Sequence, residues 1–316
     1  MPKIYLAPLA GCSDLAFRLI CREYGAKFAF FEMVDAHSLI YESRQTFDVL
    51  ETCPEDKPIA AQLLGCDPDI MLKAAKRLLA IVKVSSIDVN AACPVTKVIK
   101  KKCGAYLMRD PSGLYKTIKK LVSSLDIPIT VKLRSGFEME DHKKLVSIAK
   151  NCEKHGAATI FIHGRTRSQL YSGDVDYEAI RLVKENVKVP VFGSGNVFNH
   201  ELAKKMFDET GCDGILVARG AFGNPWIFKQ IEDYLKDCKL PHKISMASRK
   251  KALKRHLYLV NKYRKGVESS KVGIMRKVGI WYSKSFKNAA KLRGLFGQAR
   301  SYEEILALVE KFICGV

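Results

Sequence analysis

The chain has 316 residues, 47% of them hydrophobic, which is enough for two domains or for one large barrel with an appended domain. No segment approaches the roughly 18 apolar residues of a membrane-spanning helix, so we expect no membrane partner. The formal net charge of +20 is uneven, because residues 236–316 hold 20 basic and 5 acidic side chains (+15), whereas residues 1–235 contribute only +5. This asymmetry favours a polyanionic partner, most commonly a nucleic acid.

The ten cysteines are scattered, and none belongs to a C-x-x-C pair, which argues against a structural zinc site. The first residues, MPKIYLAPLAG, lack the long apolar run of a secretory signal. Together these features predict a cytoplasmic protein with reduced thiols. No two histidines at helical spacing accompany a carboxylate, so we expect no metal site.

Short apolar runs recur along the first 220 residues, separated by segments with helical periodicity such as 68–82 and 142–156. The runs lack polar alternation, which is typical of strands buried on both faces of a parallel sheet. We therefore predict a TIM (β/α)8 barrel over residues 1–238. A doubly wound open sheet is less favoured, because no G-x-G-x-x-G follows the first run. The runs are residues 4–8, 28–34, 59–65, 87–94, 129–136, 159–165, 189–196 and 214–220.

Almost every run ends in a residue with useful chemistry. The carboxyl ends of the strands of a TIM barrel meet at one mouth, where these enzymes carry out catalysis. One such residue alone would be more simply explained as structural, but a polar group at nearly every strand end predicts a shared site. The residues are Pro8, Glu32, Gln62, Asn90 with Cys93, Lys132 with Arg134, His163 with Arg165, Asn196 and Arg219.

The ends of the last two runs predict a phosphate site. The seventh run ends in GSGN, residues 193–196, and the eighth ends in ARG, residues 218–220. Glycines let backbone N–H groups approach an anion, and an arginine adds a forked contact. The loops after strands seven and eight are the usual phosphate site of this barrel, so a phosphate-bearing organic cofactor is expected.

The C-terminal quarter predicts a small, basic, all-helical domain over residues 239–316. In the segment 249–266, Leu253, Leu257, Val260 and Tyr263 recur at helical spacing, with lysines and arginines on the other face. The segment 273–294 repeats this plan, and Ser301 with Glu304 forms a capping box for another helix. The aromatic residues Trp281, Tyr282 and Phe286 are expected to be core residues and not base-stacking platforms.

Several motifs resemble those of the tRNA-dihydrouridine synthases and occur in the same order. They are APLAGCSD, IDVNAACPVTKV, LMRDP, ITVKLRSG, IHGRTRSQLYSG, GSGNV and ARGAFGNPWIF, followed by MRKVGIWYSK near residues 275–284. The B-type bacterial enzymes and their archaeal relatives look most similar. The resemblance implies a flavoprotein that uses FMN and NADPH to reduce specific uridines of tRNA to 5,6-dihydrouridine. The oligomeric state is not readable from the sequence, and a monomer is the expectation.

The resemblance also implies roles for individual residues. Cys93 matches the catalytic cysteine of the family. The expected FMN contacts are Pro8, Leu9, Ala10, Gln62, Lys132, His163, Gly195, Asn196, Ala218 and Arg219. Asn90 and Arg134 are expected to bind the edge of the target base, and Lys97, Arg276 and Lys277 are expected to contact the RNA.

The chain departs from the family pattern at a few positions. Ala92 precedes Cys93 where the family usually has glycine, and Lys102 and Cys103 replace small residues in a nearby loop. Val278 stands where the family often has histidine after Arg276 and Lys277. None of these changes removes a group that the chemistry requires.

The expected reaction assigns a role to the thiol of Cys93. Reduced flavin donates hydride to C6 of uracil, and C5 must then receive a proton. A free thiol has a pKa near 8.5, so it is protonated at neutral pH and can act as the general acid. Two other functions remain open: a flavin barrel that reduces a free pyrimidine, and a non-catalytic RNA-binding protein on a flavin-barrel scaffold.

Overall fold

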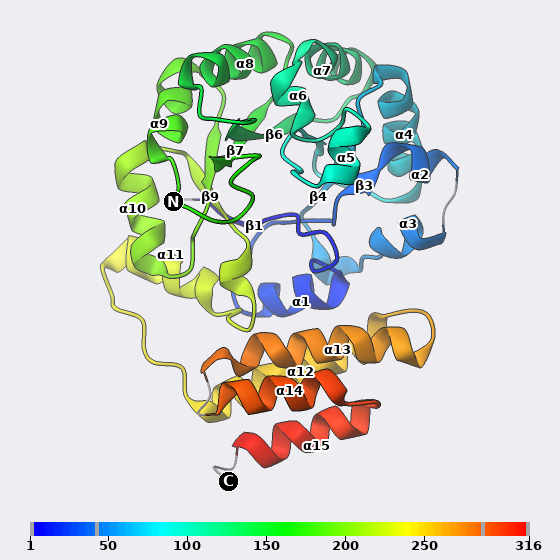
Figure 1. The fold of residues 1–316 in the computed structure, drawn as a ribbon, viewed down its shortest axis with the longest axis vertical. Helices are drawn as coiled ribbons and strands as arrows, with labels where there is room; N and C mark the ends of the chain where they lie inside the picture. Colours follow the sequence, from blue (N-terminus) through cyan, green and yellow to red (C-terminus); the bar gives the residue numbers. More distant parts are fainter. Residues whose placement is uncertain (1–2, 42–43, 286–287, 314–316) are drawn as a thin grey trace.

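The structure, a computed structural model, describes residues 3–41, 44–285 and 288–313 (Figure 1). Within these residues the strands form one parallel sheet in the order β2-β1-β9-β8-β7-β6-β5-β4-β3, and an additional β2–β4 pairing closes the sheet into a barrel. This closure confirms the predicted TIM barrel. The strands are β1 (Lys3–Leu6), β2 (Ala29–Phe30), β3 (Val34–Asp35), β4 (Ile59–Leu64), β5 (Ile87–Asn90), β6 (Ile129–Gly136), β7 (Thr159–Thr166), β8 (Val191–Ser194) and β9 (Gly214–Val217).

The second predicted strand is divided into two pieces. Both β2 and β3 pair with β4, at Ala29↔Ile59 and Val34↔Leu63, so together they occupy the position of one barrel strand. In the interruption, a carboxylate oxygen of Glu32 accepts a hydrogen bond from the backbone N–H of Gly11. The break therefore turns Glu32 toward the loop that follows β1.

The barrel helices follow from apolar spacing and capping residues. Helix α4, for example, buries Met71, Ala74, Ala75 and Leu78 on one face. Asp67 caps its start, and Pro68 occupies its first turn. The helices of the barrel region are α1 (Leu15–Glu23), α2 (Ala36–Ile40), α3 (Arg44–Val49), α4 (Pro68–Ile81), α5 (Thr96–Lys100), α6 (Tyr106–Arg109), α7 (Ser112–Ser124), α8 (His142–Lys154), α9 (Tyr177–Asn186), α10 (His200–Thr210) and α11 (Ile227–Asp237).

Aromatic side chains fill the interior of the barrel. Phe30, Phe161 and Phe192 belong to one buried cluster. The ring centroids of Phe30 and Phe161 are 5.4 Å apart, and those of Phe161 and Phe192 are 5.1 Å apart. These distances suit edge-to-face packing. The packed interior leaves the mouth at the carboxyl ends of the strands for ligands.

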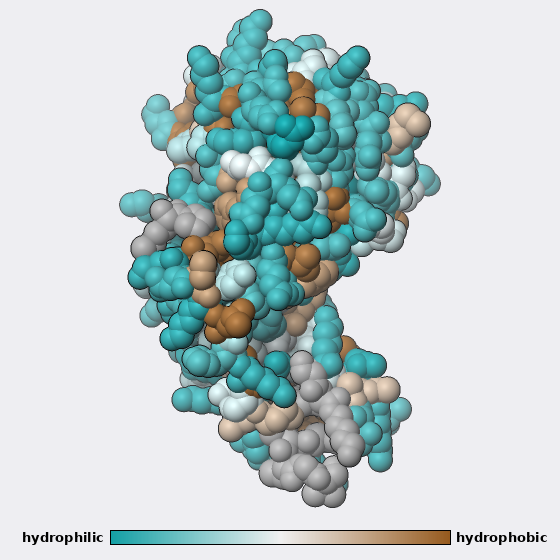
Figure 2. All heavy atoms as spheres, turned by 90° about the vertical axis from the view of Figure 1, so that its left-hand side faces the viewer, coloured by the Kyte–Doolittle hydropathy of each residue, from teal (hydrophilic) through white to brown (hydrophobic). Residues whose placement is uncertain are grey.

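The C-terminal region is helical, as predicted, and stacks against the side of the barrel at α1 (Figure 1). Leu253, Leu257 and Val260 are buried, as their spacing predicted. Figure 2 shows a mostly hydrophilic surface whose outline narrows between the barrel and this region. The helices are α12 (Met246–Tyr263), α13 (Glu268–Tyr282), α14 (Ala289–Gln298) and α15 (Tyr302–Ile313).

An aromatic cluster joins the two regions. The ring of Trp281 from α13 stacks on that of Phe222 after β9, with centroids 4.3 Å apart. Trp281 and Tyr282 are 9% and 1% exposed, which confirms their predicted place in the core, whereas Phe286 lies outside the described residues. Among the described helices, none is long and apolar enough to cross a membrane.

Candidate active site

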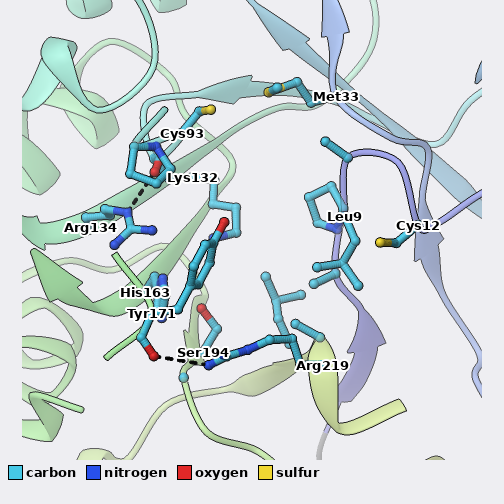
Figure 3. Close-up of a pocket in the computed structure, with 18 of the residues that line it drawn as sticks. Leu9, Cys12, Met33, Cys93, Lys132, Arg134, His163, Tyr171, Ser194 and Arg219 are labelled. Atoms are coloured by element: carbon cyan, nitrogen blue, oxygen red, sulfur yellow. Dashed lines mark hydrogen bonds between the residues drawn. The ribbon is translucent and has the colours of Figure 1, made fainter. Parts of the chain in front are cut away.

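A cavity of about 320 Å³ opens at the carboxyl ends of the strands (Figure 3). Cys93 lies at one end of this space and Arg219 lies toward the other. The structure thus brings together predicted residues from all around the barrel. The predicted residues that line the cavity are Pro8, Leu9, Ala10, Gln62, Asn90, Cys93, Lys132, Arg134, His163, Gly195, Asn196, Ala218 and Arg219.

The loop after β5 holds Cys93 through the side chain of Asn90. The Asn90 Oδ1 atom accepts hydrogen bonds from the backbone N–H groups of Ala92 and Cys93, at 3.0 and 2.8 Å. The Asn90 Nδ2 atom donates to Gln62 Oε1 at 2.7 Å. The side-chain oxygen of Asn90 thus accepts two hydrogen bonds, which hold the backbone of the cysteine loop, residues 91–95, in place.

The same hydrogen-bond network continues to buried side chains on strands β4, β5 and β6. Gln62 Nε2 donates to Asp88 Oδ2 at 2.7 Å, and Thr130 Oγ1 donates to Asp88 Oδ1 at 2.6 Å. Burial raises the pKa of Asp88 to about 6, despite these hydrogen bonds. Adjacent strands β4, β5 and β6 thus supply a continuous chain of buried polar groups, which makes the position of Asn90 rigid.

Cys93 is 9% exposed, and burial raises the pKa of its thiol above the ordinary value, although Arg134 and Lys132 oppose the shift. The sulfur is therefore protonated at neutral pH. This state suits a general acid and not a nucleophile, which needs the thiolate.

Lys132 and His163 place two nitrogen bases in the cavity. Burial, followed by the charge of Arg134, lowers the pKa of Lys132 to about 8. Burial, together with Lys132 and nearby arginines, lowers the pKa of His163 well below its ordinary value. His163 is thus neutral at physiological pH, while Lys132 stays mostly protonated.

The guanidinium group of Arg134 is directed mainly at backbone oxygens. Its Nε atom donates to the Ala92 carbonyl at 2.7 Å, and its Nη1 atom donates to the carbonyls of Thr166 and Leu170 at 2.7 and 3.0 Å. Arg134, like Asn90, therefore joins the cysteine loop to its surroundings. These contacts favour a positioning role for both residues, and their expected contact with the edge of a base stays a prediction.

Two glycines of the predicted phosphate site are required by close packing of the chain. Gly195 has φ +131°, and a Cβ atom there would lie 2.9 Å from Val175 Cγ2. A Cβ atom on Gly220 would lie 2.0 Å from the carbonyl oxygen of Val197. Only glycine fits either position, because other parts of the chain pack closely against both, and phosphate binding here stays a prediction. Arg219 stands beside this cradle, and its guanidinium carbon lies 5.2 Å from the centroid of the Tyr171 ring.

Sequence reasoning missed some residues of the cavity. Tyr171 is 54% exposed and lies near the guanidinium groups of both Arg134 and Arg219. Its motif, IHGRTRSQLYSG, was noted without a role for the tyrosine. Cys12 lines the side of the cavity opposite Cys93 (Figure 3), in the motif APLAGCSD. Both residues stand close to a glycine within these motifs, and this was the sequence signal that could have placed them in the cavity.

Three predicted RNA contacts lie outside the cavity. Lys97 is exposed on α5, and the Arg276 Nε atom donates to the Ala299 carbonyl at 2.6 Å. The Lys277 Nζ atom donates to the Gly11 carbonyl at 2.5 Å, which ties α13 to the loop after β1. The contact of these three residues with RNA stays a prediction, and Lys277 also has a structural partner in the barrel.

A closed parallel barrel whose mouth combines glycines, cationic side chains and a nearly buried thiol is typical of a TIM-barrel enzyme. The sequence profile of the dihydrouridine synthase family (Dus) matches residues 5–314. The chain belongs to this family, which confirms the family predicted from the motifs.

Relatives in this family are similar over nearly their whole length. The chain is 37% identical over 293 residues to the "probable tRNA-dihydrouridine synthase" of Rickettsia bellii, which covers 92% of this chain and 89% of the relative. It is 33% identical over 310 residues to "tRNA-dihydrouridine synthase B" of Pseudomonas aeruginosa, covering 98% and 92%. Among solved structures, histamine dehydrogenase from Rhizobium sp. 4-9 matches with a TM-score of 0.54 and 11% identity. That match covers 81% of this chain but 48% of the dehydrogenase, and it supports the fold alone.

Proposed function

We propose that this protein reduces uridines in tRNA to 5,6-dihydrouridine, with FMN as bound cofactor and NADPH as the reductant. The proposal is supported by membership of the dihydrouridine synthase family and by the names of its relatives. The single observation that carries it is the position of Cys93, a nearly buried thiol that lines the cavity at the mouth of the barrel. We infer a cytoplasmic monomer, which remains a prediction.

The residues of the cavity fit a flavin nucleotide. Gly195, Asn196, Ala218 and Arg219 would hold the phosphate, because they combine a glycine-shaped cradle with a guanidinium group. Gln62, Lys132 and His163 would contact the ring and ribityl chain, with the backbone of Pro8, Leu9 and Ala10 alongside. When bound and reduced, FMN supplies the hydride that C6 of the uracil accepts.

The chain itself supplies the proton. Cys93 holds a proton on Sγ, and we infer that it delivers this proton to C5 of the base. Negative charge develops toward the O4 carbonyl as C6 becomes saturated, and buried cations such as Lys132 and Arg134 lower the energy of that charge. Asn90 keeps the cysteine loop in one place, so that the thiol does not have to be ordered at each turnover.

The target uridine must leave the folded RNA to reach the cavity. Extruding a base costs a few kcal/mol, and phosphate contacts elsewhere can offset this cost. We assign those contacts mainly to a helical domain of residues 239–316, because residues 236–316 carry +15 of the charge. Lys97, Arg276 and Lys277 are the individual RNA contacts proposed, the first from the barrel and the others from α13.

Replacing Cys93 with alanine tests this function. Dihydrouridine formation in a tRNA transcript should fall by roughly 10²–10⁴, which is the usual contribution of a positioned general acid. FMN binding and flavin reduction by NADPH should persist, because the thiol is not part of the cradle. Cys12→Ala, which removes a thiol from the other side of the same cavity, is the matched control and should retain activity.

Three results would contradict the proposal. Unchanged turnover in Cys93→Ala would remove the acid role, and loss of FMN would make Cys93 a structural residue. Reduction of free uridine as fast as of tRNA would indicate a small-molecule reductase.

A further inference from the structure

Cys66 and Cys103 form a pair of thiols that the proposed reaction does not use. Cys66 follows β4 and is half-buried, whereas Cys103 follows α5 and is 8% exposed. Both sulfur atoms contact the carbonyl oxygen of Lys101, at 3.5 Å for Cys66 and 3.3 Å for Cys103. Segments far apart in the sequence thus bring two thiols to the same carbonyl oxygen, and Cys66 packs against the small cluster that contains Cys103.

This pair lies directly beside Cys93. Leu64, Cys93 and Cys103 form one small buried cluster, against which Cys66 packs. The backbone is joined as well, because the N–H of Ala105 donates to the Cys93 carbonyl at 3.0 Å.

The contact between the two loops leaves no spare room. Gly104 has φ +61°, and a Cβ atom there would lie 2.8 Å from the Cys93 carbonyl oxygen and 3.0 Å from Cys93 Cβ. Lys102 is a non-glycine residue at φ +59°, so the turn is already in an unfavourable conformation. A displacement of Cys103 is therefore transmitted to Cys93.

We propose that Cys66 and Cys103 are a redox-sensitive modification site, which a hydroperoxide converts into a reversible disulfide that displaces Cys93. In the first step the half-buried sulfur of Cys66 attacks the peroxide, the O–O bond breaks, and Cys66 sulfenic acid and an alcohol or water are formed. In the second step the sulfur of Cys103 attacks the sulfenic sulfur, water leaves, and the S–S bond forms. The two electrons of the pair have then reduced the peroxide, and a dithiol reductant restores both thiols.

The environment of Cys103 suits the second role. Burial and the hydrogen bond to Cys66 raise the pKa of Cys103 to about 12. Cys103 therefore stays protonated and unreactive toward an oxidant in bulk solvent. Its sulfur is shielded from solvent but lies beside Cys66, as a resolving cysteine requires, and its proton leaves with the sulfenic hydroxyl group as water.

The consequence for activity rests on the proposed function. An S–S bond is about 2.05 Å long, much shorter than the contact between two non-bonded sulfur atoms. Its formation draws the turn at residues 101–105 toward β4, and the contacts of Gly104 and Ala105 move the cysteine loop with it. A displacement of about 1 Å at a catalytic group can cost about 10²-fold in rate.

Oxidation of the FMN-loaded protein with hydrogen peroxide tests the site. After blocking of free thiols and digestion without reductant, mass spectrometry should find a peptide pair linked through Cys66 and Cys103. Dihydrouridine formation should fall about 10–100-fold on oxidation and return with dithiothreitol. Cys66→Ser and Cys103→Ser should each retain activity through the same treatment. Cys238→Ser, which removes an exposed cysteine far along the chain, should behave like the unmodified protein.

The outcomes separate this proposal from the proposed function. Absence of the Cys66–Cys103 link, or a link from either residue to Cys93, overturns the modification site whether or not the protein acts on tRNA. If peroxide inactivates Cys66→Ser as much as the unmodified protein, peroxide acts on Cys93 directly, and the proposed inactivation through the disulfide is overturned. Lack of activity in the reduced protein refutes the proposed function alone, because the mass spectrum still decides the disulfide. If a serine destabilises the fold, Cys103→Ala replaces it.

Discussion

Replacing Asn90 with alanine distinguishes a residue that holds the cysteine loop from one that contacts the substrate. Asn90 is 5% exposed, its Oδ1 atom accepts from the N–H groups of Ala92 and Cys93, and its Nδ2 atom donates to Gln62. Alanine removes these three hydrogen bonds and the longer one from Nδ2 to Met33 Sδ at 3.4 Å. The two backbone donors then lose their acceptor in a buried place, and the chain of polar groups that starts at Asp88 loses its end.

The size of the effect follows from the two donors. Each buried donor left without an acceptor costs about 1–3 kcal/mol, so the pair costs about 2–6 kcal/mol in unfolding free energy. Since 1 kcal/mol shifts the melting temperature of a large domain by about 2–4 °C, we expect a fall of at least about 4 °C. The freed loop no longer fixes the thiol, so kcat should fall while KM for tRNA changes little.

Thermal melting of the FMN-loaded protein gives the first quantity, and initial rates over a range of tRNA concentrations give the second. Asn186→Ala is the matched control, because the Asn186 side chain donates a single hydrogen bond to the Leu182 carbonyl, away from the cavity. An unchanged melting temperature with a raised KM would refute the reasoning. That result would assign Asn90 to the base of the substrate.

Three other perturbations have calculable results. Arg219→Ala should weaken FMN affinity about 10–100-fold in a fluorescence titration, because a hydrogen bond to a charged group contributes about 1.5–3 kcal/mol. Neutralising the exposed Lys251, Lys291 and Arg293 to glutamine should lower the slope of log affinity for tRNA against log salt by about 2, since each phosphate contact adds ~0.7–0.9. Burial lowers the pKa of His256 to about 3, below the value near 6.5 of an unfolded chain, so the unfolded state binds the extra proton between these values. The contribution of His256 to the free energy of unfolding is therefore fully present above pH ~6.5 and decreases as the pH falls, by about 2 kcal/mol at pH 5. His256→Phe should remove this contribution to the pH dependence.

Each of these tests has a matched control. Arg219→Lys keeps a positive charge and should recover part of the FMN affinity. Neutralising the exposed Lys73, Lys76 and Lys119 on α4 and α7 should leave the salt slope unchanged, and an equal fall there would mean that RNA is not held mainly by the C-terminal region. His242→Gln, at an exposed histidine, should keep the acid sensitivity. Unaltered FMN affinity in Arg219→Ala would remove this residue from the phosphate site.

The fold was predictable because strands buried on both faces leave continuous apolar runs, and those runs do not depend on distant contacts. The division of the second run into β2 and β3 was not. Glu32 lies in the interruption and accepts a hydrogen bond from the N–H of Gly11, and no local pattern connects these two residues. Because Glu32 is a polar residue at the end of an apolar run, the sequence predicted that it belongs near the mouth, but not that it binds Gly11.

The membership of the site was also predictable, because strand ends meet at one mouth, but the use of each side chain was not. An irregular loop such as residues 91–95 must satisfy its own backbone groups. The side chains within reach do this first, which is why Asn90 and Arg134 bind the backbone of the cysteine loop. The same residue types would serve a substrate, so the sequence alone does not distinguish the two uses.

Lys277 shows the same principle between the two regions of the chain. Its motif resembles an RNA-binding signature, yet its ammonium group donates to the Gly11 carbonyl of the loop that lines the cavity. That carbonyl belongs to a turn at Gly11, which has φ +69°. The helical region is therefore connected to the cavity by a charged contact as well as by the stacked rings of Phe222 and Trp281. A substitution at Lys277 thus changes the loop that lines the cavity, and a loss of activity there is not by itself a sign of lost RNA binding.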